Sequence, residues 1–413
     1  MRNIRATVSR HQVGGAGRPV CLCDPPEHGY KTPHPSDIGV VTATTASVDT
    51  TWNHTYPKDT EYQDMTKWRS ALNSGLVIPA CPLALRPDGT WSQQHQQTLL
   101  KYYLAAGAGG VAIAVHTTQF SIRDPQHALF QPVLKLTAEV LDEFAAPDFV
   151  RVAGICGDTN QATQEASIAA DLGYHCGLLN LSALKNESED TQIEHCRKVS
   201  QVLPVFGFYL QPAVGGCLLG FNFWKRFCEL ENVVAIKIAA FNRYQTWDVV
   251  RAVIESGRDD IVLYTGNDDN IINDLLTPFR YQGTTRRIVG GLLGQWAVWT
   301  KAAVHMLQEI HKAVQQPQLP AEWLTRNMEL TDANAVIFDA ANDFHGCIPG
   351  INEILRRQGL LPSARCLDAG EILSPGQAEE LDRIQAAYPH LTDDDFVQSH
   401  LNEWLASSDA QTA

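Results

Sequence analysis

From Gly75 onward, short apolar runs alternate with longer stretches in which apolar side chains recur at helical spacing. This alternation is typical of repeated β-α units. Because the short runs are continuously apolar, both faces of each strand are expected to be buried, as in a parallel sheet wrapped by helices. Eight such units within residues 75–294 predict a closed (β/α)8 TIM barrel. The expected strands lie at 76–83, 111–118, 151–157, 175–181, 204–211, 233–239, 261–266 and 286–293.

Two further regions flank the predicted barrel. Residues 1–74 are rich in Gly, Pro, Thr and His and show no sustained periodicity until about Tyr62, which predicts an irregular N-terminal extension. After Gly294 the helical pattern dominates and predicts a C-terminal helical region over 295–413. The expected helices lie within 295–314, 321–344, 350–361 and 375–388, and their Trp and Leu stripes are interpreted as packing surface.

Composition and charge narrow the class of protein. The chain has 413 residues, 44% of them hydrophobic and 19% charged, which is ordinary for a globular protein. Lys plus Arg is 32 against 46 for Asp plus Glu, a net charge of −14, and there is no basic run. Nucleic acid and membrane are therefore not expected as partners. Ten scattered cysteines, several within apolar runs, predict reduced and mostly buried thiols in a cytoplasmic protein.

The N-terminal extension contains two weaker signals. Its first twenty residues carry four arginines and no acid, a faint likeness to an organelle transit peptide. Cys21 and Cys23, with His28 and His34, are conceivable zinc ligands, but their spacing matches no compact four-ligand pattern. We favour an extension that wraps the barrel or an oligomer interface.

The active site of a β/α barrel lies at the carboxyl ends of its strands, so polar residues there are the candidates for chemistry. Lys237 lies in the apolar sixth strand, NVVAIKIAAF, where burial is expected to depress its pKa. A neutral amine attacks a ketone, and the resulting imine is an electron sink for cleaving or forming a neighbouring bond. A lysine that pairs with a carboxylate or binds phosphate is an equally open interpretation.

The other candidates lie on nearby strands. Tyr209 of the fifth strand is positioned to shuttle protons to the lysine, although a tyrosine in FGFYLQP also fits simple packing. Thr117 and Thr118, at the end of the second strand, offer N–H groups and hydroxyls to a carboxylate. The seventh strand ends in Thr265, Gly266, Asn267 and Asp268.

Several motifs together resemble the dihydrodipicolinate synthase/N-acetylneuraminate lyase family of class I aldolases, over about 75–388. These are GLVIPACPLALRPDGTWS, GAGGVAIAVHTTQFS, YLQPAVGG, VVAIKIA, YTGNDD and FHGCIPGINEILRRQGLL. Tyr209 and Lys237 are 28 residues apart, which is the family's usual spacing. The resemblance implies that Lys237 forms the Schiff base, that Tyr209 transfers protons and that Thr118 relays them through its hydroxyl.

The resemblance also implies the rest of the site and its partners. Thr117 is expected to bind the substrate carboxylate, and His116, Thr265 and Gly266 are expected to line the substrate site. No cofactor and no metal are implied. The expected partners are a small 2-oxo acid and an aldehyde, and the expected assembly is a homo-oligomer, a dimer or tetramer.

Three departures from the family pattern bear on the substrate. Val214 stands where the diaminopimelate-pathway member has an arginine, which argues against lysine biosynthesis. His116 and Gln119 replace the glycines beside the Thr pair, and Asn180-Leu181-Ser182 lacks the relay tyrosine that a neighbouring subunit often supplies. His116 is a candidate replacement acid or base, against a histidine that merely bonds a nearby carbonyl.

The predicted function is a Schiff-base lyase or aldolase that acts on a 2-oxo acid such as pyruvate. A 2-keto-3-deoxy sugar acid dehydratase uses the same imine and stays open. A metal-dependent lyase with His116, Asp158 and His175 as ligands is less favoured, because no ligand pair falls at a strand end. A non-catalytic 2-oxo acid-binding barrel is the third alternative.

Overall fold

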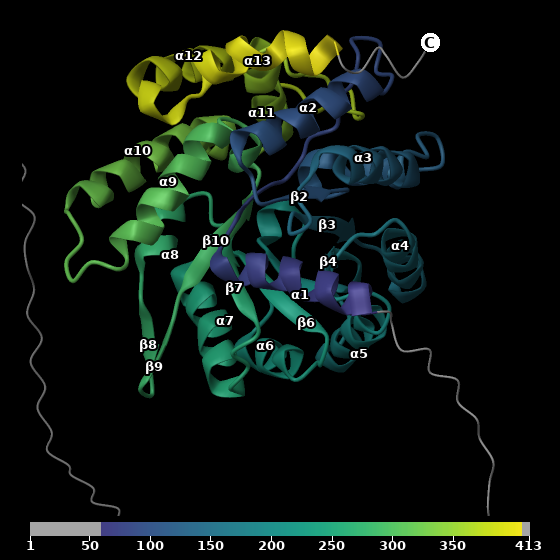
Figure 1. The fold of residues 1–413 in the computed structure, drawn as a ribbon, viewed down its shortest axis with the longest axis vertical. Helices are drawn as coiled ribbons and strands as arrows, with labels where there is room; N and C mark the ends of the chain where they lie inside the picture. Colours follow the sequence, from purple (N-terminus) through teal and green to yellow (C-terminus); the bar gives the residue numbers. More distant parts are fainter. Residues whose placement is uncertain (1–58, 407–413) are drawn as a thin grey trace, which may run out of the picture. The chain divides into compact units, whose positions relative to one another are not determined.

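The computed structural model describes residues 59–406, with side chains from Lys67 onward (Figure 1). Eight parallel strands hydrogen-bond in the order β1-β10-β7-β6-β5-β4-β3-β2. A parallel bridge between Ala80 and Ala112 joins the two ends of this order and closes the ring. The strands are β1 (Val77–Pro79), β2 (Gly110–Ile113), β3 (Val150–Ile155), β4 (Cys176–Leu179), β5 (Val205–Leu210), β6 (Val233–Ala239), β7 (Val262–Thr265) and β10 (Ile288–Leu293). The predicted barrel is thereby confirmed, each expected strand overlapping an observed one.

Helices follow the strands and cover the outside of the barrel (Figure 1). Their start points follow from local sequence: the side chains of Ser92, Asp158, Ser188 and Asn242 each accept a hydrogen bond from the first turn of the following helix. The helices are α2 (Gln93–Ala106), α3 (Phe130–Phe144), α4 (Thr159–Asp171), α5 (Glu189–Ser200), α6 (Phe221–Cys228), α7 (Arg243–Ser256), α8 (Ile271–Leu276) and α9 (Thr300–Ala313).

Buried side chains separate into two groups according to the face of the strand they occupy. An inner cluster inside the barrel contains Phe206, Phe208 and Tyr264, and an outer cluster between strands and helices contains Tyr209 and Ile238. Successive side chains of a strand point to opposite faces. Neighbouring residues such as Phe208 and Tyr209 therefore face different surroundings, which decides what reaches the pocket.

The last part of the predicted irregular extension is a helix, α1 (Asp59–Ser74). Trp68 and Leu72 are buried with the inner cluster, and Trp68 stacks on His175 at the start of β4 with ring centroids 5.2 Å apart. The Tyr264 hydroxyl donates to the Leu72 carbonyl. Helix α1 thus covers the amino end of the barrel. The prediction of irregular structure is wrong for these residues, because apolar residues of α1 are sparse and give a weak periodic signal.

The C-terminal region is helical, as predicted, and its helices α9 to α13 share the outer core with the barrel. The remaining helices are α10 (Glu322–Ile337), α11 (Cys347–Arg357), α12 (Gln377–Ala387) and α13 (Asp394–Ala406). In Figure 1, α2, α11, α12 and α13 lie at the top of the view, where α13 packs on α2, and α12 packs on α10 and α11. Two elements were not predicted: α13, and the antiparallel hairpin of β8 (Phe279–Tyr281) and β9 (Thr284–Arg286).

Three further predictions concern the whole chain, and the structure bears on them only for residues 59–406. No helix of residues 59–406 is both long and apolar enough to cross a membrane. All eight cysteines in this range are without a disulfide, and seven are buried. The transit-peptide likeness and the conceivable zinc ligands Cys21, Cys23, His28 and His34 lie outside the described residues.

Candidate active site

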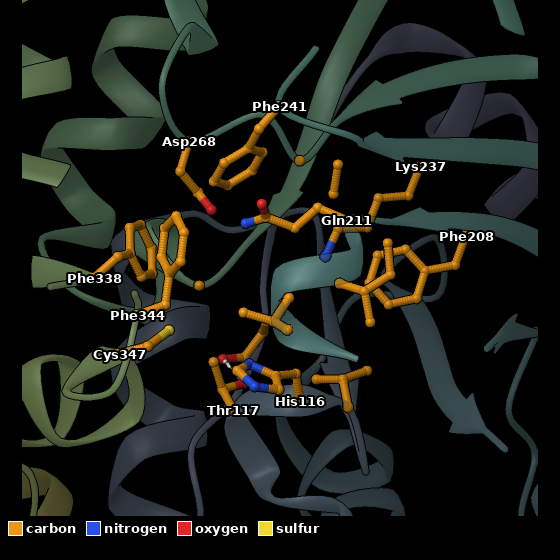
Figure 2. Close-up of a pocket in the computed structure, with 17 residues that line it drawn as sticks. His116, Thr117, Phe208, Gln211, Lys237, Phe241, Asp268, Phe338, Phe344 and Cys347 are labelled. Carbon is orange, nitrogen blue, oxygen red and sulfur yellow. Dashed lines mark hydrogen bonds between the residues drawn. The ribbon is translucent and has the colours of Figure 1, made fainter. Parts of the chain in front are cut away.

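A pocket opens at the carboxyl ends of the strands, where a β/α barrel places its chemistry (Figure 2). Its empty volume is about 600 Å³, part of which is open to solvent. Most of the wall is apolar. The polar lining residues are His116, Thr117, Gln211, Lys237, Asp268 and the thiol of Cys347, and the aromatic ones include Phe208, Phe241, Phe338 and Phe344.

Lys237 is buried in the middle of this pocket, as the sequence predicts. In the β5–β6 register it lies opposite Phe208, and its Nζ is 4.4 Å from the centre of the Phe208 ring. Burial in these apolar surroundings lowers the pKa of the amine, because the charged form loses its water. The side chain is 8% exposed and points into the cavity, so the amine is both desolvated and accessible to a small substrate.

Asp268 is the ionisable residue of the pocket that interacts electrostatically with the lysine. It follows β7 in a turn and lines the pocket, where its carboxylate points inward (Figure 2). Its Oδ1 is buried and has no hydrogen-bond partner within the described residues. Burial raises the pKa of Asp268, while the charge of Lys237 opposes the shift. Burial thus favours the neutral amine and the neutral acid, a pair that titrates together.

The polar side of the pocket opposite these groups comes from the turn after β2. Both His116 and Thr117, which the sequence analysis assigns to the substrate site, line the pocket. Burial, with the nearby charge of Lys237 as a smaller cause, lowers the pKa of His116 to about 4, so the ring is neutral near pH 7. The Thr117 hydroxyl donates to the Ala80 carbonyl at 2.7 Å, which fixes its orientation.

Thr118 does not line the pocket, although the sequence assigns it a hydroxyl relay. Its side chain is fully buried and donates to the Cys81 carbonyl at 2.7 Å. The hydroxyl proton is therefore engaged in holding the turn to the β1 loop. The structure places Thr118 in the support of the site and not at the reacting atoms.

Tyr209 is also placed away from the pocket. Register pairs it with Ile238 and not with Lys237, so its ring lies on the outer face of β5 and packs on Trp224 with ring centroids 5.4 Å apart. Its hydroxyl accepts a hydrogen bond from the Leu219 N–H at 3.3 Å. Because the strand alternates, Phe208 takes the inward position, and the role of Tyr209 in proton transfer stays a prediction that this placement does not favour.

The two predicted residues at the end of β7 separate in the same way. Gly266 lines the pocket, and a Cβ there would lie 2.5 Å from Cε of Lys237, so only glycine leaves room for the lysine stem. Thr265 faces outward, where its hydroxyl donates to Asp274 at 2.6 Å. Asn267 donates to the same carboxylate and accepts from the Phe241 N–H, so this network holds the loop that carries Gly266 and Asp268.

The alternative metal site does not assemble. His175 precedes β4 at the amino end of the barrel, where its Nδ1 accepts from the Arg151 N–H, whereas His116 follows β2 at the carboxyl end. Asp158 caps α4. No group of three or more His, Cys, Asp or Glu side chains suited to hold a metal occurs among residues 59–406.

Seven aromatic or polar pocket residues were not assigned to the site from the sequence: Phe208, Gln211, Phe241, Phe338, Phe344, Cys347 and Asp268, although the last stood in a strand end that the sequence did indicate. Phe208 and Gln211 flank Tyr209 in FGFYLQP, so the strand was found and its inward positions were not. Val214, noted in place of an arginine, does line the pocket.

The structure is a closed parallel barrel with a desolvated lysine in a pocket at the carboxyl ends of its strands. Barrel proteins of this class are suited to chemistry on an amine. The chain belongs to the dihydrodipicolinate synthetase family, whose model matches residues 73–316. This confirms the resemblance drawn from the motifs and supports the expectation of an enzyme of the lyase class.

Individual relatives agree with the family match. The chain is 24% identical over 311 residues to a 4-hydroxy-tetrahydrodipicolinate synthase of Bifidobacterium longum (strain DJO10A), which covers 72% of this chain and 92% of the relative. Among solved structures, the dihydrodipicolinate synthase from Oceanobacillus iheyensis aligns with a TM-score of 0.62 at 16% identity, over 78% of this chain and 99% of that chain. The enzyme from Acinetobacter baumannii, complexed with pyruvate, aligns at 0.60 and 17% identity, over 77% and 99%.

Proposed function

We propose that this protein is a class I lyase that binds a 2-oxo acid such as pyruvate as an imine on Lys237 and makes or breaks a carbon-carbon bond next to it. The observation that carries the proposal is the buried, accessible amine of Lys237 in one pocket with Asp268, whose Oδ1 is buried and has no hydrogen-bond partner within the described residues. Family membership supports the same chemistry. The pyruvate-bound relative from Acinetobacter baumannii supports pyruvate as the first ligand to test.

The chemistry of the pair balances without another catalyst. The neutral amine of Lys237 attacks the keto carbon, and Asp268 donates a proton to the departing oxygen, which leaves as water with a second proton from the amine. The product is a protonated imine beside the Asp268 carboxylate. That carboxylate then takes a proton from the carbon next to the imine, which gives the enamine and restores the acid.

His116, Gln211 and the backbone N–H of Thr117, whose hydroxyl is engaged with the Ala80 carbonyl, are proposed to hold the substrate carboxylate and carbonyl. All three line the pocket, and Figure 2 shows His116 and Thr117 on the side toward which the Lys237 amine points. In this assignment Asp268 replaces Tyr209 as the proton-transfer group. Gly266 contributes only space for the lysine stem.

The oligomeric state and the cellular compartment of the protein are proposed from the family resemblance and from its thiols. We propose a homo-oligomer, as the resemblance implies, which light scattering on the purified protein tests. We also propose a cytoplasmic location, since eight unpaired thiols suit a reducing compartment.

The test of function is reductive trapping. The protein is incubated with pyruvate and sodium borohydride, its intact mass is measured and the modified peptide is mapped. An adduct on Lys237 that is absent from Lys237→Ala and retained by the exposed-lysine control Lys185→Ala supports the proposal. If neither pyruvate nor longer 2-oxo acids leave an adduct, the proposal fails and a non-catalytic barrel is favoured. With trapping established, product analysis separates bond cleavage from dehydration of a sugar acid.

A further inference from the structure

Four phenylalanine rings line the pocket around the lysine: Phe208, Phe241, Phe338 and Phe344. Phe208 lies under the Lys237 amine, and Figure 2 shows Phe338 and Phe344 on the other side of the cavity, away from the lysine. Phe241 and Phe344 contact each other edge to face, with ring centroids 5.9 Å apart. The part of a substrate that extends away from Lys237 therefore meets aromatic carbon.

The backbone holds this aromatic wall in a conformation that side chains rarely adopt. Phe241 and Phe344 have φ angles of +50° and +66°, in the left-handed region, and Asp343 before Phe344 has +52°. Such a conformation is strained for a residue with a bulky side chain and persists only where the surroundings enforce it. Such conformations cluster at ligand sites, and here they aim two rings into the cavity.

Hydrogen bonds and close packing supply that enforcement. The Phe241 N–H donates to the Asn267 side chain at 2.9 Å, and the Phe344 N–H donates to the Asp339 carbonyl at 3.0 Å. The Asp339 carboxylate accepts from Ser374 and from the Gly346 N–H, which ties down the segment between α10 and α11. A Cβ on Gly294 would lie 3.1 Å from the Phe338 ring, so this glycine admits the ring into the wall.

The wall offers little to a polar substrate tail. Among the residues that line the pocket there is no arginine, and Val214 adds an apolar side chain, so a second carboxylate on the substrate would find no arginine partner. The polar side chains on that side are Asp268 and Gln211, which the proposed function already assigns to the reacting groups, and the Cys347 thiol (Figure 2). A sugar tail with several hydroxyl groups would therefore leave water and bring some of them against rings without a partner. Burying polar groups without partners costs more than burying carbon.

We propose that the aldehyde partner of the reaction is apolar and best of all aromatic, with its ring held among Phe241, Phe338 and Phe344. This proposal rests on the proposed function and names its substrate class. In the condensation, the enamine carbon of pyruvate bonds to the aldehyde carbon, the carbonyl π bond breaks and its oxygen takes a proton to become a hydroxyl. Water then hydrolyses the imine, which releases a 4-hydroxy-2-oxo acid with an aryl group on C4 and regenerates the lysine.

The experiment compares aldehydes at saturating pyruvate. The probes are benzaldehyde, hexanal, glyceraldehyde and succinic semialdehyde, and the readout is kcat/KM for formation of the hydroxy-oxo acid. Benzaldehyde is expected to exceed glyceraldehyde and succinic semialdehyde by at least about tenfold, because it gains both ring burial and ring-ring contacts. Hexanal is expected to fall between them, since it gains burial without ring contacts.

Variants locate the preference on the wall. Phe344→Asn keeps a residue that tolerates the left-handed backbone but removes the ring, and it should lose most of the advantage of benzaldehyde over glyceraldehyde. Phe344→Leu keeps apolar volume and should lower benzaldehyde more than hexanal. Phe144→Leu, a half-exposed phenylalanine of α3 outside the pocket, is the matched control and should leave all four values unchanged.

Trapping with pyruvate and borohydride is run on every variant without aldehyde, which separates the two proposals. If trapping is intact but glyceraldehyde or succinic semialdehyde is the best acceptor, the proposal of an aromatic aldehyde substrate is overturned. The same holds if trapping is intact and no aldehyde is turned over. In both cases the proposal of an imine on Lys237 stands. Loss of trapping in the unmodified protein overturns both. If Phe344→Asn traps pyruvate normally and keeps the aldehyde preference of the parent protein, the aromatic wall is not the cause of that preference.

Discussion

Lys237 reaches the pocket across the bare α-carbon of Gly266. A Cβ at position 266 would lie 2.5 Å from Cε of Lys237 and 2.9 Å from Cβ of Ala239, closer than real Cβ contacts come. The amine and the glycine lie on neighbouring strands, β6 and the end of β7. The position of the reactive nitrogen therefore depends on a residue that contributes no functional group.

Gly266→Ala is expected to displace the lysine side chain and reduce the rate of pyruvate trapping by about a hundredfold, since an error of 1 Å in placement has this effect. The measurement is the initial rate of adduct formation by intact mass. Gly220→Ala is the control, because a Cβ at Gly220 meets nothing within 4 Å. Equal rates in the two variants would show that the lysine does not depend on this gap.

The ionisation of Lys237 is expected to depend on Asp268. Burial lowers the pKa of the amine and the charge of Asp268 raises it, so Asp268→Asn should lower the pKa of Lys237 further. Consequently the neutral amine should be present at lower pH in the variant than in the parent protein. The measurement is the pH dependence of Lys237 acetylation by acetic anhydride, read by peptide mass, which needs no proton donor from the protein.

The rate of pyruvate trapping should nevertheless fall in the same variant. Asp268→Asn should reduce pyruvate trapping by about a hundredfold or more, because the proton donor and acceptor is gone even though the amine is more often neutral. Asp269→Asn, in the same turn, is the matched control and should retain trapping. A midpoint of acetylation that stays or rises in Asp268→Asn would contradict the coupling of the two groups.

Tyr209→Phe separates the two placements of this tyrosine. With the ring on the outer face of β5, the variant should keep pyruvate trapping within about twofold and lose about 1–3 kcal/mol of stability, because the buried Leu219 N–H loses its acceptor. Trapping rates and urea unfolding measure the two effects. A large loss of trapping with unchanged stability would return Tyr209 to the pocket, as the family spacing implies.

This tyrosine also shows how far the sequence leads. Continuous apolar runs predicted the strands, and a lysine within one of them predicted the reactive amine. The spacing of 28 residues between Tyr209 and Lys237 did not decide which side chains face each other, because the β5–β6 register shifts between Val205 and Phe206. A shift of one residue exchanges the two faces of a strand.

The aromatic wall was beyond sequence reasoning for another reason. Phe338 and Phe344 stand in a segment of helical pattern, AVIFDAANDF, that predicts packing against a core. Left-handed backbone at Asp339 and Asp343 turns the chain between α10 and α11 and directs the rings into the pocket. Asp tolerates that conformation, but its presence does not require it.

The helix at the amino end of the barrel is expected to be a determinant of stability and not of chemistry. Trp68 is 3% exposed and packs on His175 and the inner cluster, at the end of the barrel opposite Lys237. Trp68→Ala should lower the free energy of unfolding by about 3–5 kcal/mol through lost burial and the cavity left behind. Leu324→Ala, at a side chain of α10 that is 64% exposed, is the control and should change it by less than about 0.5 kcal/mol. Urea unfolding measures both, and pyruvate trapping by the folded Trp68→Ala protein should match the parent. If trapping is lost while the protein stays folded, α1 also shapes the pocket through the barrel core.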